Sequence, residues 1–154
     1  MKIENILRPD CVVTGIQAST KKDILTELAR PIAELYDINL SEMVSVLLSR
    51  EKLGSTGIGD GVAIPHGKIS GLKSIAAAVG ISREGLKFDA LDGEPCHIFF
   101  LLVAPGDSIS GHLKALARAS MLLKNAELRD ELIAAESPAE LYQAILNRDN
   151  QLDS

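Results

Sequence analysis

The sequence predicts a single three-layer α/β domain, with a mixed central sheet of about five strands and helices on both faces. Segments with apolar residues at helical spacing alternate with short apolar runs typical of strands, and no linker or repeat divides them. The longest apolar run, residues 97–103, has the length and aromatic content of a central strand covered on both faces. With 154 residues, 46% of them hydrophobic, the chain can bury one substantial core. We expect the domain to span residues 1–154, with an ordered core over residues 3–148.

The N-terminal segment is expected to form a turn, a strand and a helix. Residues 3–7 indicate an amphipathic opening turn that ends at Pro9, and residues 11–13 indicate a short strand. Thr20 begins a helix, because an acidic residue follows it at the spacing of a capping box. Pro31 lies inside the helical pattern, where it either kinks the helix or divides it in two.

The middle of the chain is expected to form a second helix, two turns and a strand. Ser41 is the expected N-cap of the second helix, which ends near Gly54 and carries Arg50 in its last turn. Residues 74–81 indicate a strand whose small side chains allow close packing. Turns are expected within residues 82–87 and again at residues 88–93, just before the central strand.

The C-terminal part of the chain is expected to be helical after residues 104–107 end the central strand. The expected helices span residues 110–123, 125–135 and 137–147. Ser137 and Glu140 form a full capping box, with proline at the first helical position between them. The polar tail, residues 148–154, is expected to fray.

The composition excludes several classes of partner. A formal net charge of −5 argues against binding to a nucleic-acid backbone and suits a partner with basic groups around its own site. No apolar run reaches the roughly 20 residues that span a bilayer, and the first residues lack the form of a signal peptide. We therefore expect a cytoplasmic protein. Cys11 and Cys96 lie far apart in strand-like runs, so we interpret both as small buried hydrophobes.

The most informative stretch runs from Gly54 to Gly67, because five glycines surround one histidine there. Glycine permits positive φ and close approach of bare N–H groups, so residues 54–57 predict a loop that can surround an anion. The apolar residues 62–64 predict a buried strand that delivers His66 to a turn, where the preceding proline stiffens the chain.

A rigid histidine beside an anion-sized loop, with Arg50 upstream, indicates a phosphoryl acceptor. The same spacing is also compatible with an ordinary surface histidine. Arg50 is likewise compatible with a solvated cation at a helix end, where it favours the helix dipole.

The segment itself resembles a known signature. Arg50-Glu51, followed by Gly-Ser-Thr-Gly-Ile-Gly-Asp-Gly-Val-Ala-Ile-Pro-His-Gly, closely resembles the active-site signature of IIA proteins of the bacterial sugar phosphotransferase system, fructose/mannitol type. The nitrogen-regulatory IIA branch is especially similar, and the resemblance extends over residues 5–147. Residues 88–93 and His112 also match family positions. One departure is Asp60, where asparagine is more usual, and this residue adds a negative charge near an incoming phosphate.

The resemblance implies that Nε2 of His66 accepts a phosphoryl group from an HPr-like phosphocarrier protein. An ordinary imidazole has a pKa of about 6.5, so it keeps a free lone pair at cell pH, and its other nitrogen should donate to a backbone carbonyl. Arg50 would contact the phosphoryl oxygens as a planar fork. His112 matches a second family histidine that lies near the first. Ser55 and Thr56 either donate hydrogen bonds to the phosphate or stabilise the turn. No cofactor is expected.

Three functions remain open at this point. The first is a phosphoryl carrier that regulates nitrogen-, carbon- or potassium-related targets through its phosphorylation state. The second is a free-standing IIA component of a fructose- or mannitol-type uptake system, which passes the group to a IIB domain. The sequence contains no IIB-like or membrane segment, which favours the first. The third is zinc binding, with His66, His97 and His112 as three ligands of the metal.

Overall fold

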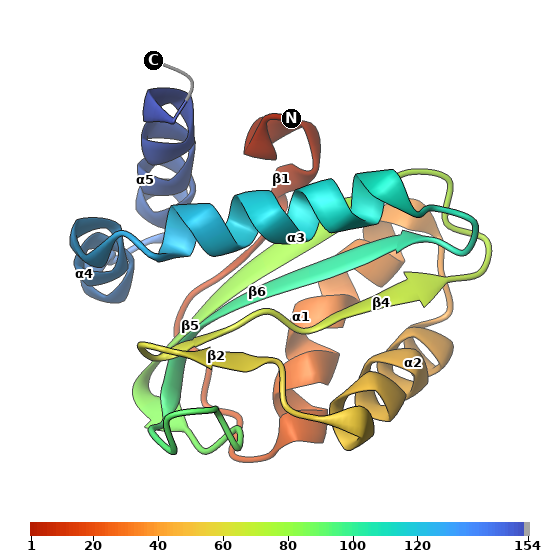
Figure 1. Ribbon diagram of the computed structural model, residues 1–154, viewed down its shortest axis with the longest axis horizontal. Helices are drawn as coiled ribbons and strands as arrows, with labels where there is room; N and C mark the ends of the chain where they lie inside the picture. The colour runs from red at the N-terminus through yellow and green to blue at the C-terminus, as the bar shows by residue number, and fades with distance from the viewer. Residues whose placement is uncertain (153–154) are drawn as a thin grey trace.

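A mixed six-stranded sheet forms the centre of the computed structural model, which describes residues 1–152 (Figure 1). The main path through the sheet is β1 (Leu7–Val13), β5 (Ala76–Leu86), β6 (Cys96–Pro105), β3 (Val62–Ala63) and β2 (Gly57–Gly59). β4 (His66–Ile69) pairs with β6 beside β3. The β5–β6 and β2–β3 pairs are antiparallel, and the other pairs are parallel. The predicted mixed sheet is therefore confirmed.

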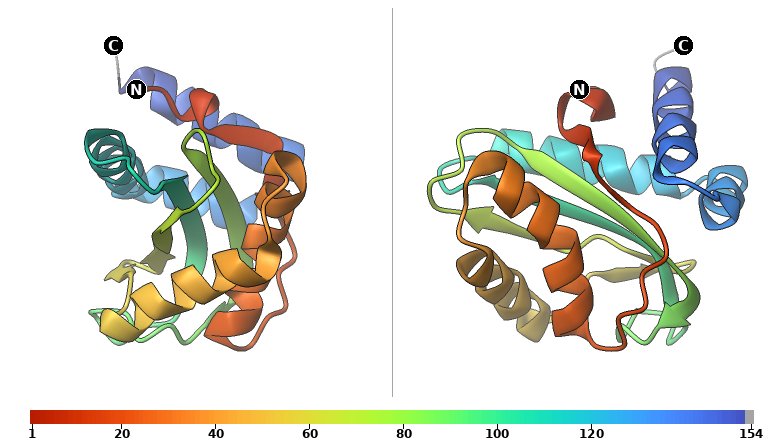
Figure 2. Two further views of the ribbon diagram at one scale, coloured as in Figure 1. Left: turned by 90° about the vertical axis from the view of Figure 1, so that its right-hand side faces the viewer. Right: turned by 180° about the vertical axis from the view of Figure 1, so that it is seen from behind.

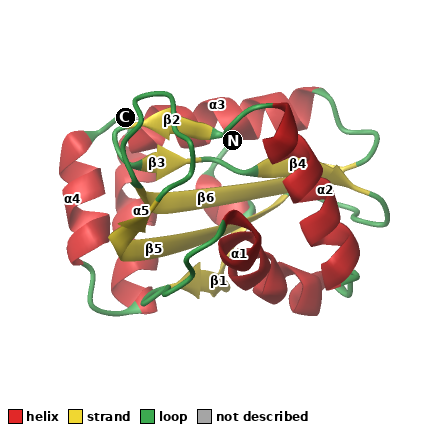
Figure 3. Cartoon of the chain, turned by 90° about the horizontal axis from the view of Figure 1, so that it is seen from below, coloured by secondary structure: helices red, strands yellow, loops and turns green. Residues whose placement is uncertain are grey.

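Helices cover both faces of this sheet. The helices are α1 (Lys21–Tyr36), α2 (Leu40–Leu53), α3 (Ser110–Leu123), α4 (Ala126–Ala134) and α5 (Pro138–Gln151), with a short 3-10 helix at Ile3–Asn5. The left view of Figure 2 shows the sheet between α3 on one side and α1 on the other. α2 packs against α1 and β4, and Figure 3 shows these two helices as neighbours. The three-layer architecture is confirmed.

The central strand is the most buried element. Each residue from 98 to 104 is at most 1% exposed, so β6 is covered on both faces as predicted. Phe99 packs edge-to-face on Phe88, with ring centroids 5.4 Å apart. Burial of each large side chain in such a core contributes about 1.5–3 kcal/mol to the free energy of folding. β6 is therefore rigidly held, and it fixes the positions of the strands that pair with it.

The first two helices begin and continue for identifiable reasons. The Thr20 side chain accepts a hydrogen bond from the Asp23 backbone N–H, as predicted. α1 continues through Pro31, so the proline does not divide the helix. Its buried face, which includes Leu28 and Ile32 on either side of the proline, packs on the sheet and stabilises the continuous helix. The second N-cap is Asn39, whose side chain accepts from Glu42 N, so the prediction of Ser41 was wrong by two residues.

Two strands are longer than predicted. β5 continues through residues 82–86, where a turn was expected, because Leu86 still pairs with Cys96 after a register irregularity. The polar sequence and glycine of this bulged segment resemble a turn when read alone. β1 likewise begins at Leu7 and includes Pro9, which interrupts no inner ladder because β1 is an edge strand with an irregular register there.

The C-terminal helix is also longer than predicted. α5 extends to Gln151, beyond the expected end at Asn147, and the expected frayed tail is therefore wrong for residues 148–151. The cause is Asp149, which is 1% exposed and binds Arg118 Nε at 2.7 Å and the backbone N–H of Ile3 at 2.8 Å. This buried ion pair attaches the last turn to α3 and to the N-terminus. The remaining tail residues, 153–154, lie outside the described part of the chain.

Cys11 and Cys96 are both buried and free, as expected for structural residues. Burial raises the pKa of each thiol to about 11, so neither is a reactive thiolate at neutral pH. None of the helices formed by residues 1–152 has both the length and the apolar character that a membrane span requires.

Candidate functional site

His66 is the first residue of β4, not part of a free turn as predicted. It lies opposite Leu102 in the parallel ladder with β6, and Leu102 N donates to the carbonyl of Pro65 at 2.9 Å. Pro65 has no N–H to donate, so the chain beside β6 is interrupted between β3 and β4 at Ile64 and Pro65. The interruption occurs directly before the histidine, and the ladder then fixes the histidine backbone against the central strand.

The imidazole of His66 is oriented by its own segment. Its Nδ1 lies 2.8 Å from the carbonyl oxygen of Ile64. A carbonyl oxygen only accepts, so Nδ1 carries the proton and donates, and Nε2 of the neutral ring keeps its lone pair. The predicted hydrogen bond to a backbone carbonyl is confirmed.

His112 lies beside His66, with ring centroids 5.5 Å apart and ring planes tilted by 54°. The topology explains this proximity, because β6 ends at Pro105 and α3 then turns back over the same end of β6 that pairs with β4. His112 is in the first turn of α3 and 9% exposed. Burial lowers its pKa from the ordinary value of 6.5, and the charges of His66 and Lys68 lower it further. The neutral form of His112 is thereby favoured.

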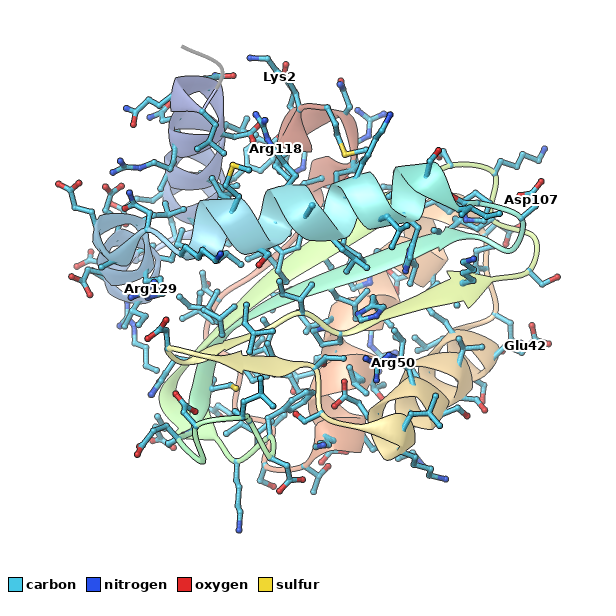
Figure 4. The ribbon with its side chains drawn as sticks, viewed as in Figure 1. Lys2, Glu42, Arg50, Asp107, Arg118 and Arg129 are labelled. Atoms are coloured by element: carbon cyan, nitrogen blue, oxygen red, sulfur yellow. The ribbon has the colours of Figure 1, made fainter. Side chains whose placement is uncertain are left out.

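Arg50 approaches the same end of β4 from the other side. α2 packs against β4 and runs in the opposite direction, as Figure 1 shows. Val46 lies against Gly67, where an added Cβ would be 2.9 Å from Val46 Cγ1. Arg50 is one helical turn further along, toward the start of β4, and Figure 4 shows its side chain between α2 and β4. Its Nη1 donates to the carbonyl of Gly54 at 2.9 Å, which leaves its other donors for a ligand.

The segment from Gly54 to Gly57 does not present its hydroxyls as an anion cradle. Ser55 Oγ donates to the Phe88 carbonyl at 2.5 Å and accepts from Gly57 N at 3.0 Å. The Thr56 hydroxyl donates to the Glu51 carboxylate. Of the two roles left open for these side chains, stabilisation of the turn is the one that the contacts support.

Asp60 belongs to a β-hairpin, away from His66. Asp60 and Gly61 connect β2 to β3 and both have positive φ, of 57° and 76°, as a type I′ turn requires. Asp60 N donates to Asp92 Oδ2 at 3.1 Å. Val62 and His66 face positions of β6 that are four residues apart, which corresponds to about 13 Å. The expectation that Asp60 adds charge beside the phosphate is therefore wrong, because the turn faces the other end of β3.

The three histidines do not converge. His97 Nδ1 donates to the carbonyl of Ser82 at 3.0 Å, and the His97 ring packs by Gly61 and Gly85 near the β2–β3 turn. Within residues 1–152, no group of three His, Cys, Asp or Glu side chains could hold a metal ion. The geometry therefore does not support the zinc site.

Two residues near the site were given no role from the sequence. Lys68 is two positions after His66 on β4, so both side chains face the same side of the strand, and its charge reaches His112. Strand alternation would have found it, had β4 been predicted as a strand. Glu51 is buried beneath the glycine segment. Glu51 is part of the family signature, but no local pattern indicated that its side chain is buried.

Comparison with known proteins identifies the family to which the chain belongs. Residues 5–148 match the family model described as "Phosphoenolpyruvate-dependent sugar phosphotransferase system, EIIA 2". A crystal structure of the nitrogen regulatory protein IIA-Ntr from Neisseria meningitidis superposes with a TM-score of 0.86 at 31% identity, over 93% of this chain and 98% of that one. The chain belongs to the type 2 EIIA family of the phosphotransferase system.

Within the family, the similar proteins include regulators and sugar-transport components. The chain is 37% identical to a nitrogen regulatory protein of Bradyrhizobium diazoefficiens, over 94% of this chain and 95% of that protein. It is 36% identical to a nitrogen regulatory protein of Pseudomonas aeruginosa, over 97% and 98%. It is also 34% identical to the fructose-specific EIIABC component of Bacillus subtilis. That match covers 99% of this chain but only 24% of the Bacillus subtilis protein.

Proposed function

We propose that this protein is a phosphoryl carrier that accepts a phosphoryl group on Nε2 of His66 and regulates target proteins through its phosphorylation state. The observation that carries this proposal is the hydrogen bond from Nδ1 of His66 to the Ile64 carbonyl. That bond leaves the Nε2 lone pair free, on a ring that is held in one orientation. Family membership supports phosphoryl transfer as the chemistry.

The transfer step needs little from the protein beyond position and charge. The Nε2 lone pair forms a new bond to phosphorus as the bond between phosphorus and the donor breaks, and the electron pair of the broken bond stays with the donor as the leaving group. Arg50 contacts the phosphoryl oxygens with the donors that Gly54 does not use. His112 is favoured in its neutral form, so it can accept a hydrogen bond or donate one to a phosphoryl oxygen. Positioning and charge stabilisation are the main catalytic contributions in phosphoryl transfer.

The donor we propose is an HPr-like phosphocarrier protein. Exposed apolar side chains lie near the histidine pair and can form a docking face: Val46 packs on Gly67, and Ile109 and Leu113 flank His112 in sequence, with 71% and 61% exposure. The net charge of −5 favours a partner whose own site is basic. We also propose a cytoplasmic location, where such a donor works.

Regulation is preferred to sugar uptake for one reason. The two nitrogen regulatory relatives are 37% and 36% identical to this chain and the fructose-specific relative 34%, and the solved structure that superposes with a TM-score of 0.86 is a nitrogen regulatory protein. Phosphorylation adds about −1.5 to −2 charge to the proposed docking face, which changes partner binding without a large movement of the fold. The alternative is a IIA component that passes the group to a IIB domain.

Two experiments test the proposal. Incubation with a phosphoenolpyruvate-fed phosphocarrier system should add the mass of one phosphoryl group to the intact protein, and no mass gain would contradict the carrier function. Pull-downs with the unphosphorylated protein and with His66→Glu should then retrieve different partners. Recovery of a IIB protein, with prompt phosphoryl transfer to it and onward to a sugar, would establish the uptake alternative.

A further inference from the structure

Glu51 is a buried carboxylate next to the proposed phosphate ligand Arg50. Its side chain is 3% exposed, yet it lies at the end of α2 where the chain enters the glycine segment. Three donors converge on it: Thr56 N at 3.2 Å, the Thr56 hydroxyl, and Lys21 Nζ at 3.3 Å. A carboxylate is an acceptor only, with about four lone-pair sites, so it can satisfy all three donors at once.

These contacts close a tight turn around Gly54. The Glu51 carboxylate holds Thr56 from one side, and the Glu51 carbonyl accepts from Gly54 N at 3.1 Å. The carbonyl of Gly54 then accepts from Arg50 Nη1 at 2.9 Å. The Glu51 carboxylate therefore holds Thr56, the Arg50 guanidinium holds the Gly54 carbonyl, and the backbone of residues 54–56 connects the two contacts.

The far side of this turn is held as well. Lys21 also binds Asp89 at 3.4 Å, and its Nζ is 4.8 Å from the centre of the Phe88 ring. Gly57 packs so closely on Ala90 that an added Cβ would be 2.8 Å from the Ala90 Cβ. The glycine segment is thus fixed between the end of α2 and the residues before β6, and the Glu51 carboxylate is joined to the two sides through Thr56 and Lys21.

We propose that Glu51 is a positioning residue for phosphoryl transfer, which acts by fixing the Gly54 carbonyl that orients the Arg50 guanidinium. Glu51 itself does not contact the phosphoryl group. The inference rests on the proposed function of His66 and Arg50, and it assigns to a buried residue a role in the rate of transfer. A fixed guanidinium matters because a misplacement of about 1 Å in a catalytic group can slow a reaction about a hundred-fold.

The first test compares transfer rates in Glu51 variants. Glu51→Ala should slow phosphoryl gain from the phosphocarrier about ten- to a hundred-fold. Glu51→Gln should slow it less, because its single acceptor oxygen can keep one Thr56 contact. Thr56→Val, which removes the hydroxyl donor alone, should slow transfer as well, and it decides the question if Glu51→Ala does not fold. A wild-type rate in Glu51→Ala would overturn the proposal. If Glu51→Ala does not fold, a wild-type rate in Thr56→Val would overturn it.

The second test separates positioning from general stability. If Glu51 acts through Arg50, then Glu51→Ala should change the rate less than about two-fold in an Arg50→Ala background, while it still lowers the melting temperature. Asp149→Asn is the matched control, because Asp149 is also a buried, ion-paired carboxylate, attached to Arg118 far from Arg50 in Figure 4. This control should lose stability and keep the wild-type rate. Equal slowing by Glu51→Ala with and without Arg50, or equal slowing in Asp149→Asn, would overturn the proposal.

A third measurement keeps the inference distinct from the proposed function. If the wild-type protein gains no phosphoryl group, the carrier function fails, and the order of the Arg50 side chain is then measured by NMR of its guanidinium. A guanidinium that is ordered in the wild type and mobile in Glu51→Ala supports the positioning role. Equal mobility in both proteins contradicts it.

Discussion

Nδ1 of His66 donates to the carbonyl oxygen of Ile64, two residues earlier in the chain, at 2.8 Å. The residue between them is Pro65, which has no N–H and a restricted φ, so the segment has few other conformations available. The same short segment therefore places the imidazole on the sheet edge and selects its tautomer. A hydrogen bond of this kind contributes only about 0.5–1.5 kcal/mol to stability, and its effect here is on which ring nitrogen keeps its lone pair.

The first prediction concerns the acceptor. His66→Ala should abolish the phosphoryl mass gain, because the hydrogen bond to the Ile64 carbonyl leaves the Nε2 lone pair of His66 free and oriented for attack. In the wild type the adduct should be lost in acid and retained in base, as expected for phosphohistidine. Intact mass spectrometry after each treatment measures both, with circular dichroism to show that the variant is folded. Full labelling of His66→Ala would assign the acceptor elsewhere.

The second prediction concerns Arg50. Arg50→Lys keeps the positive charge, but an ammonium cannot hold the Gly54 carbonyl and a phosphoryl oxygen with one planar fork. We expect transfer to slow by about ten- to a hundred-fold, which corresponds to roughly 1.4–3 kcal/mol in the transition state. Rapid-quench kinetics with excess phosphodonor measures the rate. A wild-type rate in this variant would identify Arg50 as a helix-end cation only.

The third prediction concerns the role of His112 in transfer. His112→Ala should still form the phosphorylated protein, because the acceptor nitrogen belongs to His66. The rates of phosphoryl gain and loss should change, since the rings are 5.5 Å apart and the phosphoryl group is expected beside both. Time courses in both directions measure these rates. Unchanged kinetics in each direction would remove His112 from the site.

The fourth prediction concerns pH and stability. Burial lowers the pKa of His112 below 6.5, so the unfolded chain binds this proton more readily than the folded one. Above about pH 7 His112 is largely neutral in both the folded and the unfolded state, so its protonation does not lower the free energy of unfolding. As pH falls below 6.5, protonation of His112 favours the unfolded state and lowers the free energy of unfolding. This loss reaches its full value once the pH is below the folded-state pKa of His112.

His112→Gln removes this titration and leaves His66 and His97 in place. The free energy of unfolding of the wild type should therefore fall more steeply than that of His112→Gln between pH 7.5 and pH 5. Urea unfolding at several pH values measures the difference. Parallel profiles for the two proteins would show that His112 titrates normally in the fold.

The fifth prediction concerns the contact that holds α2 on β4. An added Cβ at Gly67 would be 2.9 Å from Val46 Cγ1, so Gly67→Ala should lower the free energy of unfolding by about 1–3 kcal/mol and slow transfer by moving α2. Val46→Ala removes the methyl group concerned, and the double variant should recover part of both losses. Urea unfolding and transfer rates of the four proteins measure this coupling. Strictly additive effects would mean that the two positions do not clash.

Local sequence determined much of this protein. The capping residues Thr20 and Ser137 begin their helices where they were predicted, and Asn125 caps the helix expected from residue 125, because each cap depends on a hydrogen bond only three residues along the chain. The apolar run of β6 identified the buried central strand for a similar reason, since a strand covered on both faces has no polar positions. The glycine segment and the histidine after Pro65 marked the candidate site.

Only the tertiary structure decided how the site residues meet. The centroid separation of 5.5 Å between His66 and His112 depends on β4 and the end of β6 lying in parallel register, which no local pattern encodes. The polar segment after Ile81 became strand and not turn because its partner, Cys96, lies across the sheet. Glu51 and Asp149 are buried for the same physical reason. Their charges are stabilised by Lys21 and Arg118, residues about 30 positions away, and a carboxylate enters the interior only where the fold brings such partners to it.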